Sequence, residues 1–196
     1  LRAVDGKNRE RDYCILCIFL NCGLRISEIV GLNLTDVASD HLRVMGKGSK
    51  ERMVYLNAAT TQALSRYLAV RSGIAAVDKN ALFLSARRKR LSRETVHAMV
   101  KKTLLKAGLD PDKYSSHKLR HTAATLMYQE GHVDMLALKE ILGHAHVSTT
   151  EIYTHMGTAQ LRQAAQASPF AKLDFEKAPE QPVKAAALPK HSDDEL

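Results

Sequence analysis

The chain has 196 residues, 45% of them hydrophobic, which is enough for one domain with a sizeable core. Its formal net charge of +8 favours a polyanionic partner such as nucleic acid, because Lys and Arg that neutralise phosphates release counterions. No apolar run approaches the length of a membrane span, so no membrane association is expected. Three cysteines, an odd number without a secretory signal, point to a cytoplasmic protein rather than a disulfide-bonded one.

The charge is unevenly divided along the chain. Residues 171–196 contain four Lys and six acidic residues, a net −2, whereas the other 25 basic and 15 acidic residues give the rest +10. Because this end is rich in Lys, Glu, Pro and Ala, we expect a folded domain over residues 1–170 and a disordered tail over residues 171–196. The chain begins with Leu, so we also expect it to be a fragment of a longer protein.

Hydrophobic periodicity predicts a mainly helical domain with one small antiparallel sheet, an α+β architecture. Local signals support the helix ends: Gly23 and Gly108 are expected stops, and Ser92 is an expected N-cap. The expected helices cover residues 8–21, 26–32, 58–71, 95–107, 116–129, 134–142, 148–155 and 158–167. Residues 41–45 and 52–56 alternate on either side of Gly46-Lys47-Gly48-Ser49, which predicts a β-hairpin with a basic tip.

The cysteines lie together in one apolar segment of the first expected helix. Cys14 and Cys17 have the spacing of a zinc knuckle, but no second Cys or His pair with ligand spacing follows. We therefore interpret them, with Cys22, as reduced cysteines packed in a helix, and we expect no metal site.

Two arginines and a histidine have the chemistry needed to bind a phosphodiester. Arg25 opens one expected helix, and His117 and Arg120 stand three residues apart on another, so the latter two share one face. A guanidinium offers two parallel donors to two phosphate oxygens, which suits a charged transition state without a metal. Each residue alone has an ordinary explanation, since Arg25 can pair with Glu28 and a lone histidine is commonly a surface residue.

Two further candidates are equally ordinary when taken alone. His144 follows Gly143 at an expected helix end, where the helix dipole favours histidine, and Tyr153 fits a half-buried packing position. The functional argument comes from the order in which these residues occur and from their neighbours.

Five short motifs follow one another in a fixed order. They are Leu24-Arg25-Ile26-Ser27-Glu28, Gly46-Lys47-Gly48-Ser49-Lys50-Glu51-Arg52, Ser116-His117-Lys118-Leu119-Arg120-His121-Thr122, Leu142-Gly143-His144 and Ile152-Tyr153-Thr154-His155. In residues and spacing they resemble the motifs of the tyrosine recombinases, also called the phage integrase family, and most of all the Xer-type enzymes. The resemblance covers residues 8–170 and includes every catalytic position of the family.

The resemblance implies a covalent mechanism. Tyr153 would attack the scissile phosphate to form a 3′-phosphotyrosine link, and the released 5′-hydroxyl of another strand would later reverse the step without ATP. Arg25 and Arg120 would stabilise the charge on the phosphate oxygens. Lys47 would protonate the leaving 5′-oxygen. The resemblance further implies that His117 assists deprotonation of the tyrosine or organises the phosphate, that His144 donates to a phosphate oxygen, and that no cofactor or metal is needed.

Other charged residues near the motifs have competing interpretations. Lys50 and Arg52 could replace Lys47 as the acid, but the glycines on both sides of Lys47 favour it, which leaves the other two as contacts with the DNA backbone. Glu28 would orient Arg25 or cap the helix turn. Basic side chains at Arg87, Arg88 and Arg90 belong to a loop that is either a solvated charge run or a set of phosphate contacts.

The resemblance also implies partners. Family members act on double-stranded DNA as homotetramers and clamp it with an additional N-terminal domain that this chain lacks, so the fragment alone could be monomeric. The helix expected at 158–167, with Leu161, Ala164 and Ala165 on one face, is the candidate for exchange with a neighbouring protomer. The alternatives are a type IB topoisomerase, which shares a similar site, and a catalytically idle DNA-binding protein.

Overall fold

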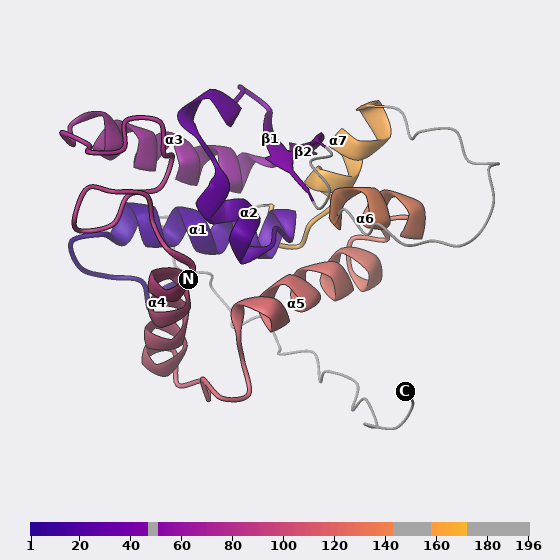
Figure 1. Cartoon of the computed structure of the whole chain (residues 1–196). Coiled ribbons are helices and arrows are strands. Elements are labelled where there is room, and N and C mark those ends of the chain that lie inside the picture. Colours follow the sequence, from indigo (N-terminus) through magenta and orange to yellow (C-terminus); the bar gives the residue numbers. More distant parts are fainter. Residues whose placement is uncertain (47–50, 143–157, 172–196) are drawn as a thin grey trace.

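The computed structural model describes residues 1–46, 51–142 and 158–171. It confirms a mainly helical chain with one two-stranded antiparallel sheet (Figure 1). The elements are α1 (Arg9–Cys22), α2 (Ile26–Gly31), the 3-10 turn η1 (Leu34–Asp36), β1 (His41–Met45), β2 (Glu51–Tyr55), α3 (Ala58–Ser72), α4 (Arg93–Lys106), α5 (Ser116–Gln129), α6 (Met135–Leu142) and α7 (Thr158–Gln166). The helix expected at 148–155 and most of the expected tail lie outside the described residues.

Short polar side chains start several of these helices. The side-chain oxygens of Asn57, Ser92 and Ser115 accept hydrogen bonds from the backbone amides three residues further on, at the starts of α3, α4 and α5. After the ends of α1 and α4, Gly23 and Gly108 adopt positive φ angles of 59° and 72°, which residues with a β-carbon rarely adopt. For the expected helices within the described residues, the predicted boundaries agree with the structure to within one or two residues, because these signals are local.

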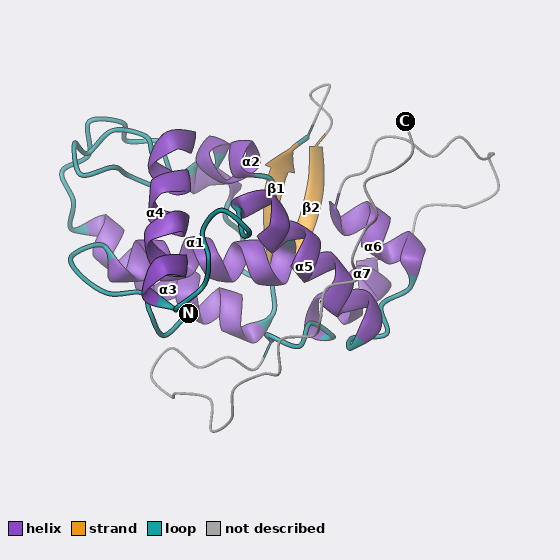
Figure 2. Cartoon of the chain, turned by 90° about the horizontal axis from the view of Figure 1, so that it is seen from below, coloured by secondary structure: helices purple, strands orange, loops and turns teal. Residues whose placement is uncertain are grey.

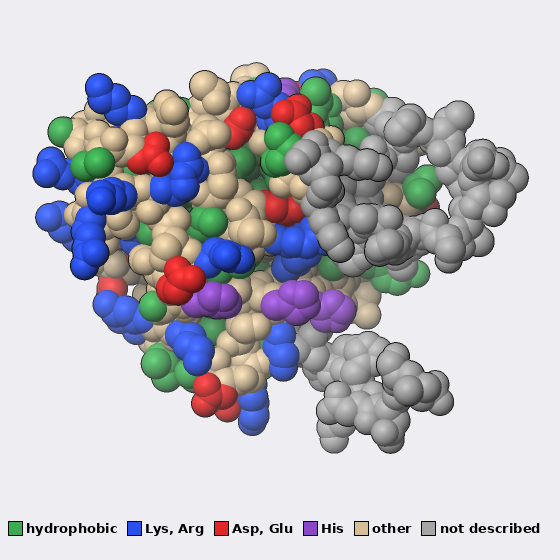
Figure 3. Space-filling model, in the orientation of Figure 1, with side chains coloured by type: hydrophobic (Ala, Val, Ile, Leu, Met, Phe, Trp, Pro, Cys, Tyr) green, Lys and Arg blue, Asp and Glu red, His purple; other side chains and the backbone are tan. Residues whose placement is uncertain are grey.

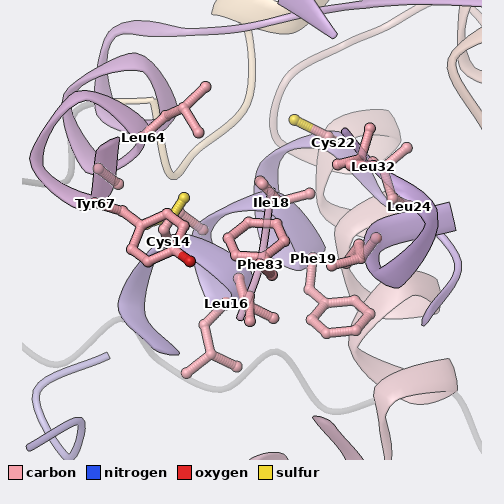
Figure 4. Packing of buried hydrophobic residues seen from close by; sticks show 14 of the residues in the cluster. Cys14, Leu16, Ile18, Phe19, Cys22, Leu24, Leu32, Leu64, Tyr67 and Phe83 are labelled. Atoms are coloured by element: carbon pink, nitrogen blue, oxygen red, sulfur yellow. The ribbon is translucent and has the colours of Figure 1, made fainter. Parts of the chain in front are cut away.

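The larger of two hydrophobic clusters is built around α1 (Figure 4). This helix is buried almost all round, with Cys14, Ile15, Ile18 and Phe19 at 0% exposure, and it packs between α3 and α5. The three cysteines are free thiols buried in this cluster, and burial raises the pKa of Cys22 to about 12. Among the described residues no group of side chains could hold a metal ion.

The smaller hydrophobic cluster joins α5, α6 and α7 to the end of β2. Leu161, Ala164 and Ala165 form the buried face of α7, as predicted, and pack against residues that include Tyr55 and Ile141. Figures 1 and 2 show the β1–β2 hairpin standing between α2 on one side and the α6–α7 pair on the other. In the described part of the chain, no helix is long and apolar enough to cross a membrane.

A buried polar cluster fastens the segment after α7 to the body. Asn57 Nδ2 donates to Asn21 Oδ1 at 2.8 Å and to the Ala165 carbonyl at 3.3 Å, and Ser168 Oγ donates to the same Asn21 oxygen at 2.8 Å. The Ala59 amide donates to the Ala171 carbonyl at 3.2 Å. In the single chain, α7 is therefore docked in cis, both by an apolar face and by hydrogen bonds.

Gly131 lies where the segment after α7 crosses the end of α5. A β-carbon at this position would lie 2.5 Å from the carbonyl oxygen of Ala167 and 2.8 Å from that of Met127, and both are backbone atoms. We expect Gly131→Ala to lower the free energy of unfolding by about 1–3 kcal/mol, since one backbone segment must move away. Urea unfolding would measure it, with Gly31→Ala as the control because no atom lies within 4 Å of a β-carbon there. Equal effects of the two substitutions would contradict the crowding.

Candidate active site

The first candidate arginine lies in the tight connection between α1 and α2. Gly23 ends α1 in the left-handed conformation, and Leu24 follows with its side chain fully buried. Arg25 then caps α2 with an extended backbone, and its side chain is 40% exposed. The sequence therefore fixes the backbone of Arg25 firmly while its guanidinium remains partly open to solvent.

The carboxylate of Glu28 lies at the centre of the candidate site. Its side chain is only 4% exposed and accepts hydrogen bonds from the amide of Arg25 at 2.8 Å and from Arg25 Nη1 at 3.1 Å. Arg52, on β2, donates to both carboxylate oxygens, at 2.9 and 3.1 Å. Arg120 Nη1, on α5, lies 3.9 Å from Oε2. One buried carboxylate thus gathers three arginines from separate parts of the chain.

Opposing effects set the ionisation of this carboxyl. Burial raises the pKa of Glu28, but hydrogen bonds from Arg52 and the Arg25 amide, together with the charges of both guanidinium groups, outweigh burial and hold the pKa below its ordinary value. Glu28 is therefore an anion at neutral pH. With three guanidinium groups around one carboxylate, the cluster carries a net charge of about +2, which suits a phosphodiester and its more highly charged transition state.

The second candidate arginine, Arg120, is buried, with a side chain 8% exposed. Its guanidinium donates to the carbonyl of Gly23 and, at 2.5 Å, to that of Leu142. Burial, and next the charge of Arg25, lower the pKa of Arg120 to about 10, so it stays protonated at neutral pH. Its two hydrogen bonds bring the end of α1 and the end of α6 to the same side of α5.

The predicted histidine of the same motif also lies on α5. His117 occupies the first turn of the helix, just after the Ser115 cap, and its side chain is exposed. Figure 3 shows a row of histidine side chains across the face that carries α4 and α5, among scattered Lys and Arg side chains. One helix therefore supplies an exposed imidazole and, three residues later, a buried guanidinium.

Four of the predicted site residues lie outside the described residues. These are Lys47, Lys50, His144 and Tyr153. In sequence, the described chain comes within a few residues of three of them: Lys47 and Lys50 lie between β1 and β2, and α6 ends at Leu142, two residues before His144. The roles of all four stay predictions.

The structure separates the residues predicted to contact DNA. Arg87 and Arg88 are exposed on their loop, in keeping with either a solvated charge run or a phosphate contact. Arg90 instead donates to the carbonyls of Val30, Gly31 and Leu32 at 3.0–3.1 Å and pairs with Asp78. It therefore holds the end of α2, a contact that joins residues about sixty positions apart and that no local pattern signals.

Arg52 was expected to contact the DNA backbone, but in the structure its side chain contacts protein groups. Its side chain is 13% exposed and is bonded to Glu28 and to the Ile141 carbonyl. Its proximity to Glu28 was not predicted. The alternation of β2 was the only available signal, since it places Arg52 on the same face as the buried Val54.

Comparison with known proteins decides the family. The model of the phage integrase family matches residues 1–160. The chain belongs to the phage integrase family. It is 54% identical over 172 residues to the tyrosine recombinase XerC of Caldanaerobacter subterraneus subsp. tengcongensis, a match that covers 88% of this chain and 49% of that protein. The chain thus spans about half the length of this curated relative.

Solved structures of Xer recombinases have a similar fold. The crystal structure of XerA recombinase is 34% identical, with a TM-score of 0.62, and the match covers 79% of this chain and 56% of that one. XerH recombinase, solved with its difH substrate in a pre-cleavage complex, is 30% identical with a TM-score of 0.62, over 72% of this chain and 42% of that one. These matches confirm the predicted fold and family.

Loss of the central carboxylate should destabilise the protein in a pH-dependent way. We expect Glu28→Gln to lower the free energy of unfolding by roughly 3–5 kcal/mol at neutral pH, because buried arginines lose their counter-charge. Since the folded-state pKa of Glu28 lies below the ordinary value of 4.5, this stabilisation is complete above that value and is lost as pH falls through the lowered pKa.

Urea unfolding of both proteins at neutral and acidic pH would measure this difference. It should shrink toward acidic pH, and a difference that stayed constant or grew would contradict the assignment. Glu94→Gln is the matched control, because Glu94 is exposed in the first turn of α4.

Proposed function

We propose that this chain is the catalytic part of a tyrosine site-specific recombinase that cuts and rejoins double-stranded DNA. The observation that carries the proposal is the convergence of Arg25 and Arg120 on the buried carboxylate of Glu28. Two motifs almost one hundred residues apart are brought together, and Glu28 and Arg120 are both charged at neutral pH. The Xer-type relatives support the same reading, because they are named recombinases and one of them was solved with its DNA substrate.

The proposed reaction begins with attack by Tyr153. Its hydroxyl oxygen bonds to the scissile phosphorus as its proton is removed with help from His117, and the bond from phosphorus to the 5′-oxygen breaks. Lys47 gives the leaving oxygen a proton, which yields a free 5′-hydroxyl and a 3′-phosphotyrosine. Attack by the 5′-hydroxyl of another strand reverses these bonds, so the tyrosine is regenerated and no net energy input is needed.

The arginines stabilise the charge that develops during this attack. Arg25 is open to solvent on one side and can reach a non-bridging oxygen, whereas Arg120 is oriented by two backbone carbonyls before any substrate arrives. Donors fixed in advance lose little by reorganising during the reaction. His144 would add a hydrogen bond to a phosphate oxygen. The proposal requires no metal ion or cofactor.

Substitution of the nucleophile tests the chemistry. We expect Tyr153→Phe to abolish covalent protein–DNA complexes, because phenylalanine has no hydroxyl with which to form the phosphotyrosine bond. The probe is a pool of short nicked duplexes with a randomised arm. After cleavage, the short strand that carries the 5′-hydroxyl diffuses away, so the reaction cannot reverse and the covalent intermediate accumulates. Denaturing gels, followed by mapping of the attached peptide, give the readout.

The matched control is Tyr128→Phe, since Tyr128 is 50% exposed on α5 and lies outside the motifs. It should leave trapping unchanged. A covalent complex that survived Tyr153→Phe would overturn the proposed nucleophile.

The proposed assembly on DNA is a homotetramer in which α7 is exchanged between protomers. In the single chain α7 docks in cis, with an apolar face and with Arg162, which pairs with Asp40 at 2.5 Å and lies over the ring of Tyr55. The acceptor surface therefore exists on every copy of the chain, and the same contacts could be made by the α7 of a neighbour.

Removal of α7 tests the exchange. A full-length protein truncated from Gly157 onward should bind single sites but lose cooperative pairing and recombination, because no helix would join the protomers. Gel-shift titration and a two-site recombination assay would measure both properties. Cooperative recombination by the truncated protein would contradict exchange in trans.

A further inference from the structure

All three nitrogens of the Arg52 guanidinium donate hydrogen bonds to protein groups. Nη1 and Nη2 donate to the two oxygens of Glu28 at 2.9 and 3.1 Å, and Nε donates to the Ile141 carbonyl at 3.2 Å. The side chain is 13% exposed. A fork-shaped, bidentate contact of this kind fixes both partners in one plane, which a point charge such as Lys cannot do.

Donors from the described residues fill the acceptor sites of the Glu28 carboxylate. A carboxylate has about four lone-pair sites. Arg52 fills two of them, and the amide and Nη1 of Arg25 fill the other two. Arg120, whose terminal nitrogens bond to Gly23 and Leu142, feels the charge of Glu28 at 3.9 Å without donating to it.

Removal of Arg52 would therefore change the hydrogen bonds between Glu28 and its other neighbours. Two acceptor sites of a buried anion would become empty, and the nearest cations among the described residues are Arg25 and Arg120. A buried unpaired acceptor is costly, so these guanidinium groups would turn toward the carboxylate and away from a bound phosphate. The net charge of the cluster would also fall from about +2 to about +1.

Arg52 also contacts the end of α6. It holds the carbonyl of Ile141, and Arg120 holds that of Leu142, the next residue and the last of the helix. Two arginines from β2 and α5 thus bind successive carbonyls at the negative end of the helix dipole. Both contacts therefore hold the last turn of α6, which ends two residues before His144 in the sequence.

We infer that Arg52 is a positioning residue for strand cleavage: it occupies Glu28 and the end of α6, so that Arg25 and Arg120 stay directed at the scissile phosphate. This inference rests on the proposed function. It differs from the sequence-based expectation that Arg52 contacts the DNA backbone, and the two make different predictions for the rate of phosphodiester cleavage at saturating protein.

The test compares Arg52→Gln with the parent chain on two trapping substrates, one with a phosphodiester and one with an uncharged methylphosphonate at the scissile position. Arg25 and Arg120 are proposed to stabilise the negative charge on the scissile phosphate, so their orientation should affect the cleavage rate less when the methylphosphonate lacks that charge. We therefore expect single-turnover cleavage of the phosphodiester at saturating protein to fall roughly 10- to 100-fold, less than the 100- to 1,000-fold loss of a direct oxyanion donor. Cleavage of the methylphosphonate should fall only a few-fold.

Arg52→Lys and Arg43→Gln are the companion variants. Lys keeps the charge but not the fork, so it should restore only part of the phosphodiester rate. Arg43 lies on β1 of the same hairpin, with a side chain 49% exposed and paired with Asp36, and its substitution should alter binding affinity at most. Equal losses on both substrates in Arg52→Gln would indicate a merely structural role, and weaker binding with an unchanged saturating rate would indicate a backbone contact; either would overturn the inference.

A readout independent of cleavage keeps the inference separate from the proposed function. Carbon-13 NMR titration of Glu28 should show a higher carboxyl pKa in Arg52→Gln than in the parent chain, because the strongest donor to the carboxylate is gone. If the parent chain cleaved no DNA but this pKa rose, the proposed function would fail and the inferred saturation of Glu28 would stand. An unchanged pKa would overturn the inference whatever the activity.

Discussion

The arrangement of the candidate site depends on one buried guanidinium. Arg120 is the side chain that touches the end of α1, the end of α6 and the neighbourhood of Glu28 at once. A buried cation must be compensated, and here two carbonyls and one carboxylate compensate it. Because these groups come from segments far apart in sequence, the charge requirement of one residue specifies how three parts of the chain meet.

This requirement acts at the boundary between the two hydrophobic clusters. Glu28 belongs to α2, which Arg25 caps and which packs on the larger cluster, whereas α6 belongs to the smaller one. Arg52 lies on the strand that runs between them. The polar contacts at the boundary do what apolar packing cannot do, since apolar contacts tolerate sliding whereas a bidentate ion pair fixes orientation. A phosphate-binding site needs that precision of orientation.

Local signals in the sequence predicted the elements and their ends. Ser92 and Gly23 act through hydrogen bonds or backbone conformations within a few residues, so they can be read without the fold. The family resemblance implied that Arg25 and Arg120 act on one phosphate, and the structure brings both side chains near Glu28. The partners of Arg52 and Arg90 could not be predicted, because each is bonded to groups brought near only by tertiary packing. For Tyr153 and His144, the sequence resemblance carries the assignment.

The buried cysteines of α1 have a practical consequence. Their thiols are enclosed in the larger cluster and resist deprotonation, with burial raising the pKa of Cys17 to about 12 as well. Because alkylating reagents attack thiolates, we expect these thiols to react slowly in the native protein. Their rate of modification would therefore report how often the larger cluster opens. A cysteine introduced on the surface could therefore be labelled with a fluorophore for DNA-binding measurements, without removal of the three native cysteines.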